Sequence, residues 1–240
     1  HGTFLSLDME EYRDLQLTVA VFEQLLADPE LADQEMGIVL QAYLPDAHDA
    51  LEELTDLARR RVAAGGARIK VRLVKGANLA MEQVEAELHG WAQAPYTGKP
   101  DVDASYVRLL DTALDASRTE AVRIGVASHN VFHLALAHLL AGERGVSEAV
   151  DVEMLQGMAP AQARAVRDTV SAAGGQVLLY TPVVAREDFD VAISYLVRRL
   201  EENAAEQNFL HAMFAAAPGS PHGIGAQEQA FLASVRDAAT

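Results

Sequence analysis

The chain has 240 residues, of which 50% are hydrophobic, so it is long enough to bury one sizeable core. Its 19 basic and 35 acidic residues give a formal net charge of −16, which disfavours binding to nucleic acids and general adhesion to anionic membranes. The chain has no cysteine, which excludes disulfides and thiolate metal sites. It shows neither a signal peptide nor an apolar run of membrane-spanning length, so we expect a soluble cytoplasmic domain.

Short β-rich runs alternate with longer helical patterns along most of the chain. The predicted strands cover residues 3–7, 37–43, 69–74, 122–128, 150–155 and 176–180. The last strong helical pattern covers residues 186–203, and a stretch rich in Gly, Pro and Ala separates it from a short helical pattern at 227–235. We therefore expect one main domain at 1–210 and a tail at 211–240.

Six strand–helix units in a row predict parallel strands joined by crossover helices. This alternation fits an open doubly wound sheet and a closed (β/α)8 barrel. No G-x-G-x-x-G follows the first strand, which weakens the dinucleotide-binding sheet without excluding other open sheets. A barrel would place the polar residues near the strand ends around its C-terminal mouth. These residues are Asp8, Gln41, Arg72, Ser128, His129, Glu153 and Tyr180.

The last predicted helix carries the most informative group of side chains. Positions i, i+3, i+4 and i+7 of one face hold Tyr195, Arg198, Arg199 and Glu202. Two neighbouring guanidinium groups beside a tyrosine could clamp a carboxylate, although the spacing also fits a solvated face with an ordinary Arg–Glu pair. We expect a separate apolar stripe of this helix to face the core. It consists of Ala192, Ile193, Leu196, Val197 and Leu200.

Two other patterns are less specific by themselves. Arg72 lies within an apolar strand, and Gly76 after it would let a ligand approach the backbone, although a rim arginine paired with an acid fits equally. Ser128, His129 and Asn130 lie where a strand ends and a helix begins. Exposed N–H groups there suit an anion, but helix capping is the simpler interpretation. The eight histidines show no H-E-x-x-H spacing, so we predict no metal site.

Taken in chain order, these motifs resemble those of the proline dehydrogenase family, including the dehydrogenase domain of bifunctional proline utilisation A enzymes. Residues 72–77 are similar to the family's fifth-strand motif, and residues 195–203 are similar to its last-helix motif. The shorter matching motifs are Leu7-Asp8-x-Glu10-Glu11, Gln41-Ala42-Tyr43, Ser128-His129-Asn130, Leu155-x-Gly157-Met158 and Tyr180-x-Pro182-Val183. The resemblance covers about residues 5–209, and its specificity lies in the order and spacing of the motifs.

The resemblance implies a distorted (β/α)8 barrel with FAD at its C-terminal mouth. It implies oxidation of L-proline to Δ1-pyrroline-5-carboxylate, the first step of proline catabolism to glutamate, with electrons passed to a membrane quinone. Contact with the membrane would then be peripheral at most. A fused or partner pyrroline-5-carboxylate (glutamate-semialdehyde) dehydrogenase and an oligomer are both compatible with this interpretation.

The resemblance also assigns roles to residues. Asp8 and Arg72 would be catalytic, with Arg72 stabilising the reduced flavin, and two arginines would grip the proline carboxylate. The implied substrate-binding residues are Leu155, Tyr180, Tyr195, Arg198 and Arg199. The implied flavin-binding residues are Met9, Gln41, Arg72, Val74, Lys75, Gly76, Ala77, Ser128, His129, Glu153 and Glu202.

The sequence departs from the family pattern in several places. Asn78 and Leu79 stand where aromatic residues are usual, Ser128 replaces a more usual threonine, and Glu153 replaces glutamine. The charge of Glu153 would lie near the flavin and could lower its potential. The first strand resembles the family's third, so we expect a barrel that lacks two strands, exposes two sheet edges and lacks a lysine that pairs with the substrate.

Two alternatives stay open. One is a different flavin barrel oxidoreductase, similar to methylenetetrahydrofolate reductase, and reduction by a nicotinamide cofactor would favour it. The other is an inactive, truncated barrel that serves as a folding or interaction module, and a protein without flavin after refolding with FAD would favour that. A related hypothesis is that the chain is active only when another chain supplies the absent strands.

Overall fold

The computed structural model describes residues 3–204, 208–214 and 223–239, without the side chains of Ser194, Arg198 and residues 201–204. Its six strands form one sheet in sequence order, and each strand pairs in parallel with the next. The strands are β1 (Leu5–Leu7), β2 (Met36–Gln41), β3 (Ile69–Val74), β4 (Val122–Ala127), β5 (Val150–Leu155) and β6 (Gln176–Tyr180).

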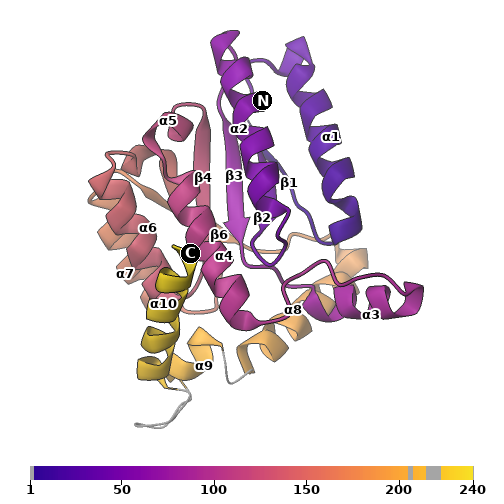
Figure 1. Ribbon diagram of the computed structural model, residues 1–240, viewed down its shortest axis with the longest axis vertical. Helices are drawn as coiled ribbons and strands as arrows, with labels where there is room; N and C mark the ends of the chain where they lie inside the picture. The colour runs from indigo at the N-terminus through magenta and orange to yellow at the C-terminus, as the bar shows by residue number, and fades with distance from the viewer. Residues whose placement is uncertain (1–2, 205–207, 215–222, 240) are drawn as a thin grey trace.

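This strand order decides between the two architectures that the sequence allowed. The order of a doubly wound sheet reverses at a switch point, whereas here it runs without reversal from β1 to β6. The sheet is curled into part of a (β/α)8-like barrel, which confirms the predicted fold class (Figure 1). Within the described residues β1 and β6 each pair with one strand only, so both are sheet edges, as expected.

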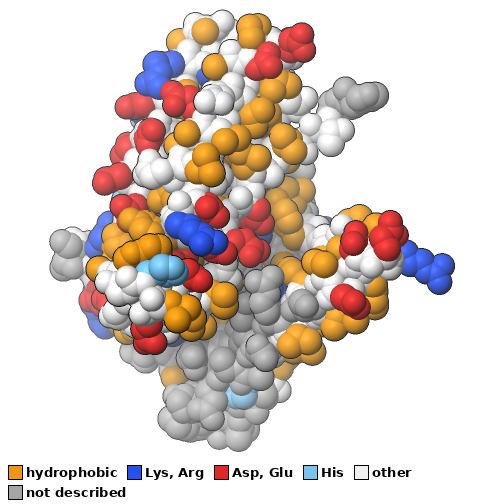
Figure 2. Space-filling model, turned by 90° about the vertical axis from the view of Figure 1, so that its right-hand side faces the viewer, with side chains coloured by type: hydrophobic (Ala, Val, Ile, Leu, Met, Phe, Trp, Pro, Cys, Tyr) orange, Lys and Arg blue, Asp and Glu red, His pale blue; other side chains and the backbone are white. Residues whose placement is uncertain are grey.

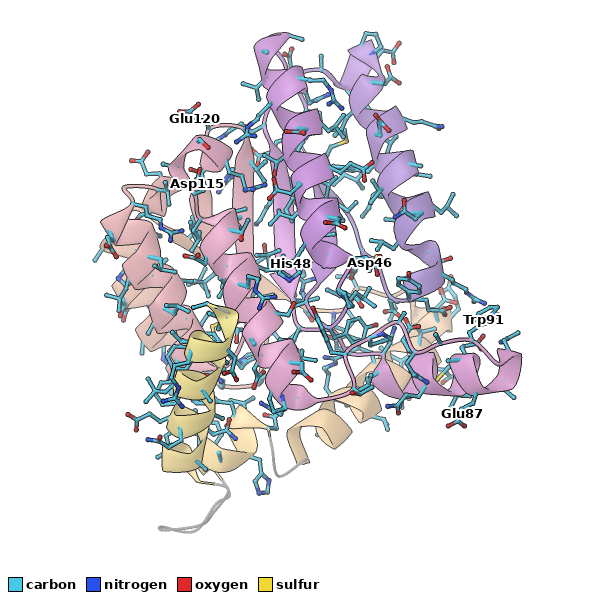
Figure 3. All side chains as sticks on the ribbon, viewed as in Figure 1. Asp46, His48, Glu87, Trp91, Asp115 and Glu120 are labelled. Carbon is cyan, nitrogen blue, oxygen red and sulfur yellow. The ribbon has the colours of Figure 1, made fainter. Side chains whose placement is uncertain are left out.

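Helices follow the strands, and several of them lie on the outside of the sheet (Figure 1). They are α1 (Leu15–Ala27), α2 (Ala47–Ala63), α3 (Leu79–His89), α4 (Lys99–Ala113), α5 (Ala116–Thr119), α6 (Val131–Glu143), α7 (Pro160–Ser171), α8 (Phe189–Ala204), α9 (Phe209–Phe214) and α10 (Ile224–Ala238). Short 3-10 turns are η1 (Tyr12–Asp14), η2 (Pro29–Leu31), η3 (Ser147–Ala149) and η4 (Arg186–Asp188). Asp115, labelled in Figure 3, begins α5 by accepting a hydrogen bond from the Ser117 amide at 2.9 Å.

The two faces of the sheet differ in chemistry because successive strand residues point to opposite sides. In β3, Ile69, Val71 and Leu73 are fully buried in the apolar core. Lys70 and Arg72 instead meet acidic side chains of β5. The sheet therefore packs an apolar face against the helices and directs charged groups into the concave side.

Two parts of the C-terminal region differ in how they pack. Helix α10 contains the helical pattern predicted at 227–235 and packs on α4 and α6, where the Arg108 Nε donates to the Ala238 carbonyl at 3.2 Å. The prediction that the apolar stripe of α8 faces the core is wrong. Ile193, Leu196 and Leu200 are 45%, 55% and 60% exposed, because the main neighbours of α8 among the described residues are only η4 and α9.

Helix α3 projects from the body on the right-hand side of Figure 1, and Figure 2 views that side. Met81 and Leu88 of this helix are exposed. Trp91, just beyond the helix and labelled in Figure 3, is also exposed, and its ring stacks on that of His89 with the ring centres 4.4 Å apart. Within the described ranges, no helix combines the length and the hydropathy needed to cross a bilayer.

Candidate active site

A pocket of about 410 Å³ opens at the carboxyl ends of the strands, the end of the sheet that α8 crosses in Figure 1. It brings together most residues that the sequence singled out. These are Asp8, Met9, Gln41, Arg72, Val74, Gly76, Ala77, Ser128, His129, Glu153, Leu155, Tyr180, Tyr195 and Arg199. The lining residues that were not proposed for the site are Glu10, Asn78, Ala127, Met154, Thr181 and Pro182.

Arg72 lies at the centre of the charged groups in this pocket. Its Nε is 2.9 Å from the Glu153 Oε2, and its Nη1 is 3.9 Å from the Asp8 Oδ1. Its guanidinium carbon also lies 4.3 Å from the centre of the Tyr180 ring, within the range of a cation–π contact. Asp8 is largely exposed and its contact is long, so Glu153 and the Tyr180 ring contribute most to fixing Arg72.

Tyr180 and Tyr195 add aromatic surface to the pocket. Burial raises the pKa of the Tyr180 phenol, and the charge of Glu153 raises it further, so the phenol keeps its proton at neutral pH. On α8, the Arg199 guanidinium lies 5.2 Å from the Tyr195 ring centre, and both residues line the pocket. One of the two proposed clamp residues therefore reaches the same rim as Asp8, Gln41 and Arg72.

His129 contributes a ring whose protonation state follows from its contacts. Its Nε2 accepts a hydrogen bond from the Leu155 amide at 3.0 Å, so the neutral ring carries its proton on Nδ1. Burial lowers the pKa of His129 and favours this neutral form. Asn130 caps α6, because its Oδ1 accepts a hydrogen bond from the Phe132 amide at 3.0 Å, and capping by Ser128 or Asn130 was the simpler interpretation of this motif. The Ser128 Oγ accepts a hydrogen bond from the Asn130 amide at 3.0 Å and so holds the turn before the helix.

The loop after β1 is held by two side-chain amides. The Gln41 Nε2 donates to the Met9 carbonyl at 2.5 Å, and the Asn78 Nδ2 donates to the Glu10 carbonyl at 2.8 Å. Asn78 was noted in the sequence only as a departure from the family pattern. Its position at the start of α3, one residue beyond the Lys-Gly-Ala triplet, is the signal that could have placed it in the pocket wall.

The backbone conformation and close packing at position 76 explain why a glycine stands there. Gly76 adopts φ +119°, and a Cβ at this position would lie 2.6 Å from the Tyr43 ring. The glycine is therefore required by the close packing of Tyr43 beneath the loop, in addition to any ligand above it.

One predicted flavin-site residue, Lys75, is not brought to the pocket. Lys75 lies outside its lining and pairs with Asp103 of α4, and its ammonium lies 5.8 Å from the Tyr106 ring centre. Burial lowers the pKa of Lys75. Burial alone would raise the pKa of Asp103, but the positive charges of Lys75 and Lys99 outweigh this effect and lower it. Arg198 and Glu202 belong to α8, but their side chains lie outside the described residues.

The pocket offers the polar groups that a flavin ring would need. The Gln41 Oε1 and the His129 Nδ1 are buried without a hydrogen-bond partner among the described residues, and both residues line the pocket. One is an acceptor and the other is a donor, which matches a planar heterocycle that carries both N–H groups and carbonyl or ring-nitrogen acceptors. These residues fit FAD on chemical grounds.

Fold and pocket together define an α/β protein with part of a (β/α)8-like barrel and a ligand site at its C-terminal mouth. The sequence model of the proline dehydrogenase family matches residues 1–212. The chain therefore belongs to the proline dehydrogenase family, which confirms the resemblance found in its motifs.

Known relatives agree with this assignment. The bifunctional protein PutA of Rhizobium meliloti is 35% identical over 218 residues, which cover 86% of this chain and 16% of that protein. A proline dehydrogenase of Deinococcus radiodurans is 28% identical over 216 residues, which cover 88% of this chain and 57% of that one. The chain thus spans less than two thirds of the length of these relatives.

Solved structures give the same fold. Proline utilization A from Corynebacterium freiburgense matches 98% of this chain at 54% identity and a TM-score of 0.85, and the match covers 22% of that protein. Proline utilization A from Bdellovibrio bacteriovorus, inactivated by N-propargylglycine, matches 88% of this chain at 37% identity and a TM-score of 0.77.

Proposed function

We propose that this chain holds FAD in the pocket at its strand ends and oxidises L-proline to Δ1-pyrroline-5-carboxylate. The observation that carries the proposal is the meeting of two groups far apart in sequence. Arg199 and Tyr195 of α8 line the same pocket as Gln41, Arg72 and Asp8. A cationic clamp next to polar groups suited to a flavin is what oxidation of a small amino acid requires.

Five residues of the pocket would hold the flavin. Gln41 would donate and accept hydrogen bonds along the ring edge, His129 would offer its Nδ1–H, and the loop at Gly76 and Ala77 would lie against the cofactor. Bound FAD supplies the two-electron acceptor that the chain's own side chains lack. Arg72 adds a fixed positive charge beside it and favours added electron density there.

The substrate would be held by charge and shape. Arg199, with Arg198 beside it in the sequence, would bind the proline carboxylate through a fork of N–H donors. Leu155, Tyr180 and Tyr195 would enclose the apolar ring and exclude water. Because Tyr180 keeps its proton, it would serve as a neutral wall and a hydrogen-bond donor, with no negative charge to repel the carboxylate.

The wider pathway follows from the same proposal. Electrons would leave to a membrane quinone through at most peripheral contact. The product would pass to a pyrroline-5-carboxylate (glutamate-semialdehyde) dehydrogenase on the same or a partner polypeptide. The similarity to relatives named bifunctional PutA supports this second step.

The test is an anaerobic titration of the FAD-loaded chain with L-proline, followed by flavin absorbance. We expect the oxidised flavin band to bleach. Arg199→Ala should weaken proline binding about 10- to 100-fold while FAD stays bound, because a hydrogen bond to a charged group contributes about 1.5–3 kcal/mol.

Arg164→Ala is the matched control, since Arg164 is exposed on α7 and does not line the pocket. It should leave proline binding unchanged. Bleaching by a nicotinamide cofactor but not by proline would favour the methylenetetrahydrofolate-reductase-like alternative, and a chain that never binds FAD would favour the inactive module.

A further inference from the structure

A cluster of buried charges lies on the concave side of the sheet, next to the pocket. The Lys70 Nζ is 2.8 Å from the Asp151 Oδ2 and 2.6 Å from the Glu153 Oε1. The other oxygen of Glu153 contacts Arg72 at 2.9 Å. Glu153 therefore connects a lysine outside the pocket lining to the arginine at its centre.

Burial makes this connection costly to break. The side chains of Lys70, Asp151 and Glu153 are 4%, 3% and 0% exposed. A carboxylate without water needs full compensation by neighbouring charges. Both oxygens of Glu153 lie at ion-pair distance from a cation. The position of this carboxylate thus depends on the charges around it.

The backbone of β4 leaves space for the ion pair between Lys70 and Glu153. Gly125 lies opposite Arg72 and Asp151 in the sheet register. A Cβ on Gly125 would lie 2.2 Å from the Glu153 Oε1 and 3.0 Å from the Lys70 Cε. No larger residue fits here unless the ion pair moves, so the strand, the lysine and the carboxylate are matched to one another.

We propose that Lys70 is a positioning residue: through Glu153 it holds the Arg72 guanidinium against the Tyr180 ring and thereby sets the charge beside the flavin. This inference rests on the proposed function. It assigns a role in the reaction to a residue that the sequence motifs leave unmarked, and it explains how a glutamate is tolerated next to the site. Lys70 balances the negative charge that Glu153 would otherwise add.

The experiment compares four forms of the full chain: the parent, Lys70→Met, Glu153→Gln and the double variant. The first readout is the midpoint potential of bound FAD. Lys70→Met should lower it, because a positive charge is lost and Arg72 is released from its position. In the Glu153→Gln background the same change should have a much smaller effect, since the lysine acts through that carboxylate.

Two controls separate positioning from folding. Lys70→Arg keeps the charge and should keep the parental potential. Arg123 also pairs with Asp151, at 2.8 Å, and contacts Glu35 at 3.2 Å on its other side. Glu35→Gln removes this more distant carboxylate and should also leave the potential unchanged. If Lys70→Met does not fold, the Gly125→Ala variant displaces the same carboxylate sterically and should lower the potential in its place.

The second readout is a crystal structure of each variant without flavin, in which Arg72 should leave the Tyr180 ring in Lys70→Met and stay there in Lys70→Arg. An unchanged potential in Lys70→Met, equal shifts in both backgrounds, or an undisplaced Arg72 would overturn the proposal. If the parent binds no FAD, the proposed function fails, and the position of Arg72 in the crystals still decides the role of Lys70.

Discussion

The replacement Asp103→Asn tests how the strand-end loop is anchored beneath the pocket. Asp103 is 7% exposed and pairs with both Lys75, which follows β3, and Lys99, one helical turn away on α4. The asparagine would leave Lys75 without its counterion, and the loss of one partner from a buried pair costs about 3–5 kcal/mol. Lys75 and Lys99 are 29% and 44% exposed, so water screens part of their charge and we expect about 3 kcal/mol.

The assay is urea unfolding at several pH values. Because Lys75 and Lys99 hold the pKa of Asp103 below its ordinary value, the carboxylate stabilises the folded chain above about pH 4, and this contribution is lost as the pH falls through the lower folded value. The variant should therefore be destabilised equally at pH 7 and pH 5. Asp101→Asn on the same helix is the exposed control and should cost less than about 1 kcal/mol. A loss below 1 kcal/mol in Asp103→Asn would refute this account of the loop.

Three further predictions concern the core and the pocket. His133 is buried beside the rings of Tyr106 and Phe231, and burial holds its pKa well below the ordinary value. The folded chain should therefore lose stability as the pH falls below about 6.5. In urea unfolding between pH 7.5 and 5.5, His133→Phe should lose less stability than the parent chain. Gly76→Ala should cost about 3 kcal/mol or more of stability in thermal unfolding, because the strain of a positive φ adds to a collision with the Tyr43 ring. Gly65 also has a positive φ but no close neighbour, so Gly65→Ala should cost about 1 kcal/mol. Arg61→Met should cost about 3–5 kcal/mol in the same assay, because the buried guanidinium donates to the carbonyls of Ala67, Leu26, Leu31, Ala32 and Gln34.

Each of these predictions has an outcome that contradicts it. An unchanged pH dependence in His133→Phe would show that other groups cause the acid sensitivity. Equal losses in the two glycine variants would mean that the Tyr43 ring yields to the new methyl group. A loss below about 1 kcal/mol in Arg61→Met would mean that water replaces the guanidinium at those carbonyls.

The strands were largely predictable because their local patterns are strong. The bounds predicted for the third, fifth and sixth strands are those of β3, β5 and β6, and the motif residues at the strand ends do meet in one pocket. The meeting of these residues follows from the topology alone, since parallel strands direct all their carboxyl ends to one edge of the sheet.

What the sequence did not reveal depends on neighbours rather than on local pattern. Lys75 follows Val74, and only the latter lines the pocket, because adjacent residues point in different directions. The link from Lys70 through Glu153 to Arg72 depends on which strands pair and in which register. The exposed stripe of α8 shows that an amphipathic pattern predicts a helix but does not supply a partner for its apolar face.

The central claim is that the pocket at the strand ends holds a flavin with a small amino acid beneath the α8 arginine. A crystal structure of the chain grown with FAD tests it most directly. The account predicts the flavin ring between Gln41, Arg72 and His129, with Arg199 facing the open side of the ring. Flavin bound elsewhere on the chain, or a pocket that stays empty at saturating FAD, would contradict it.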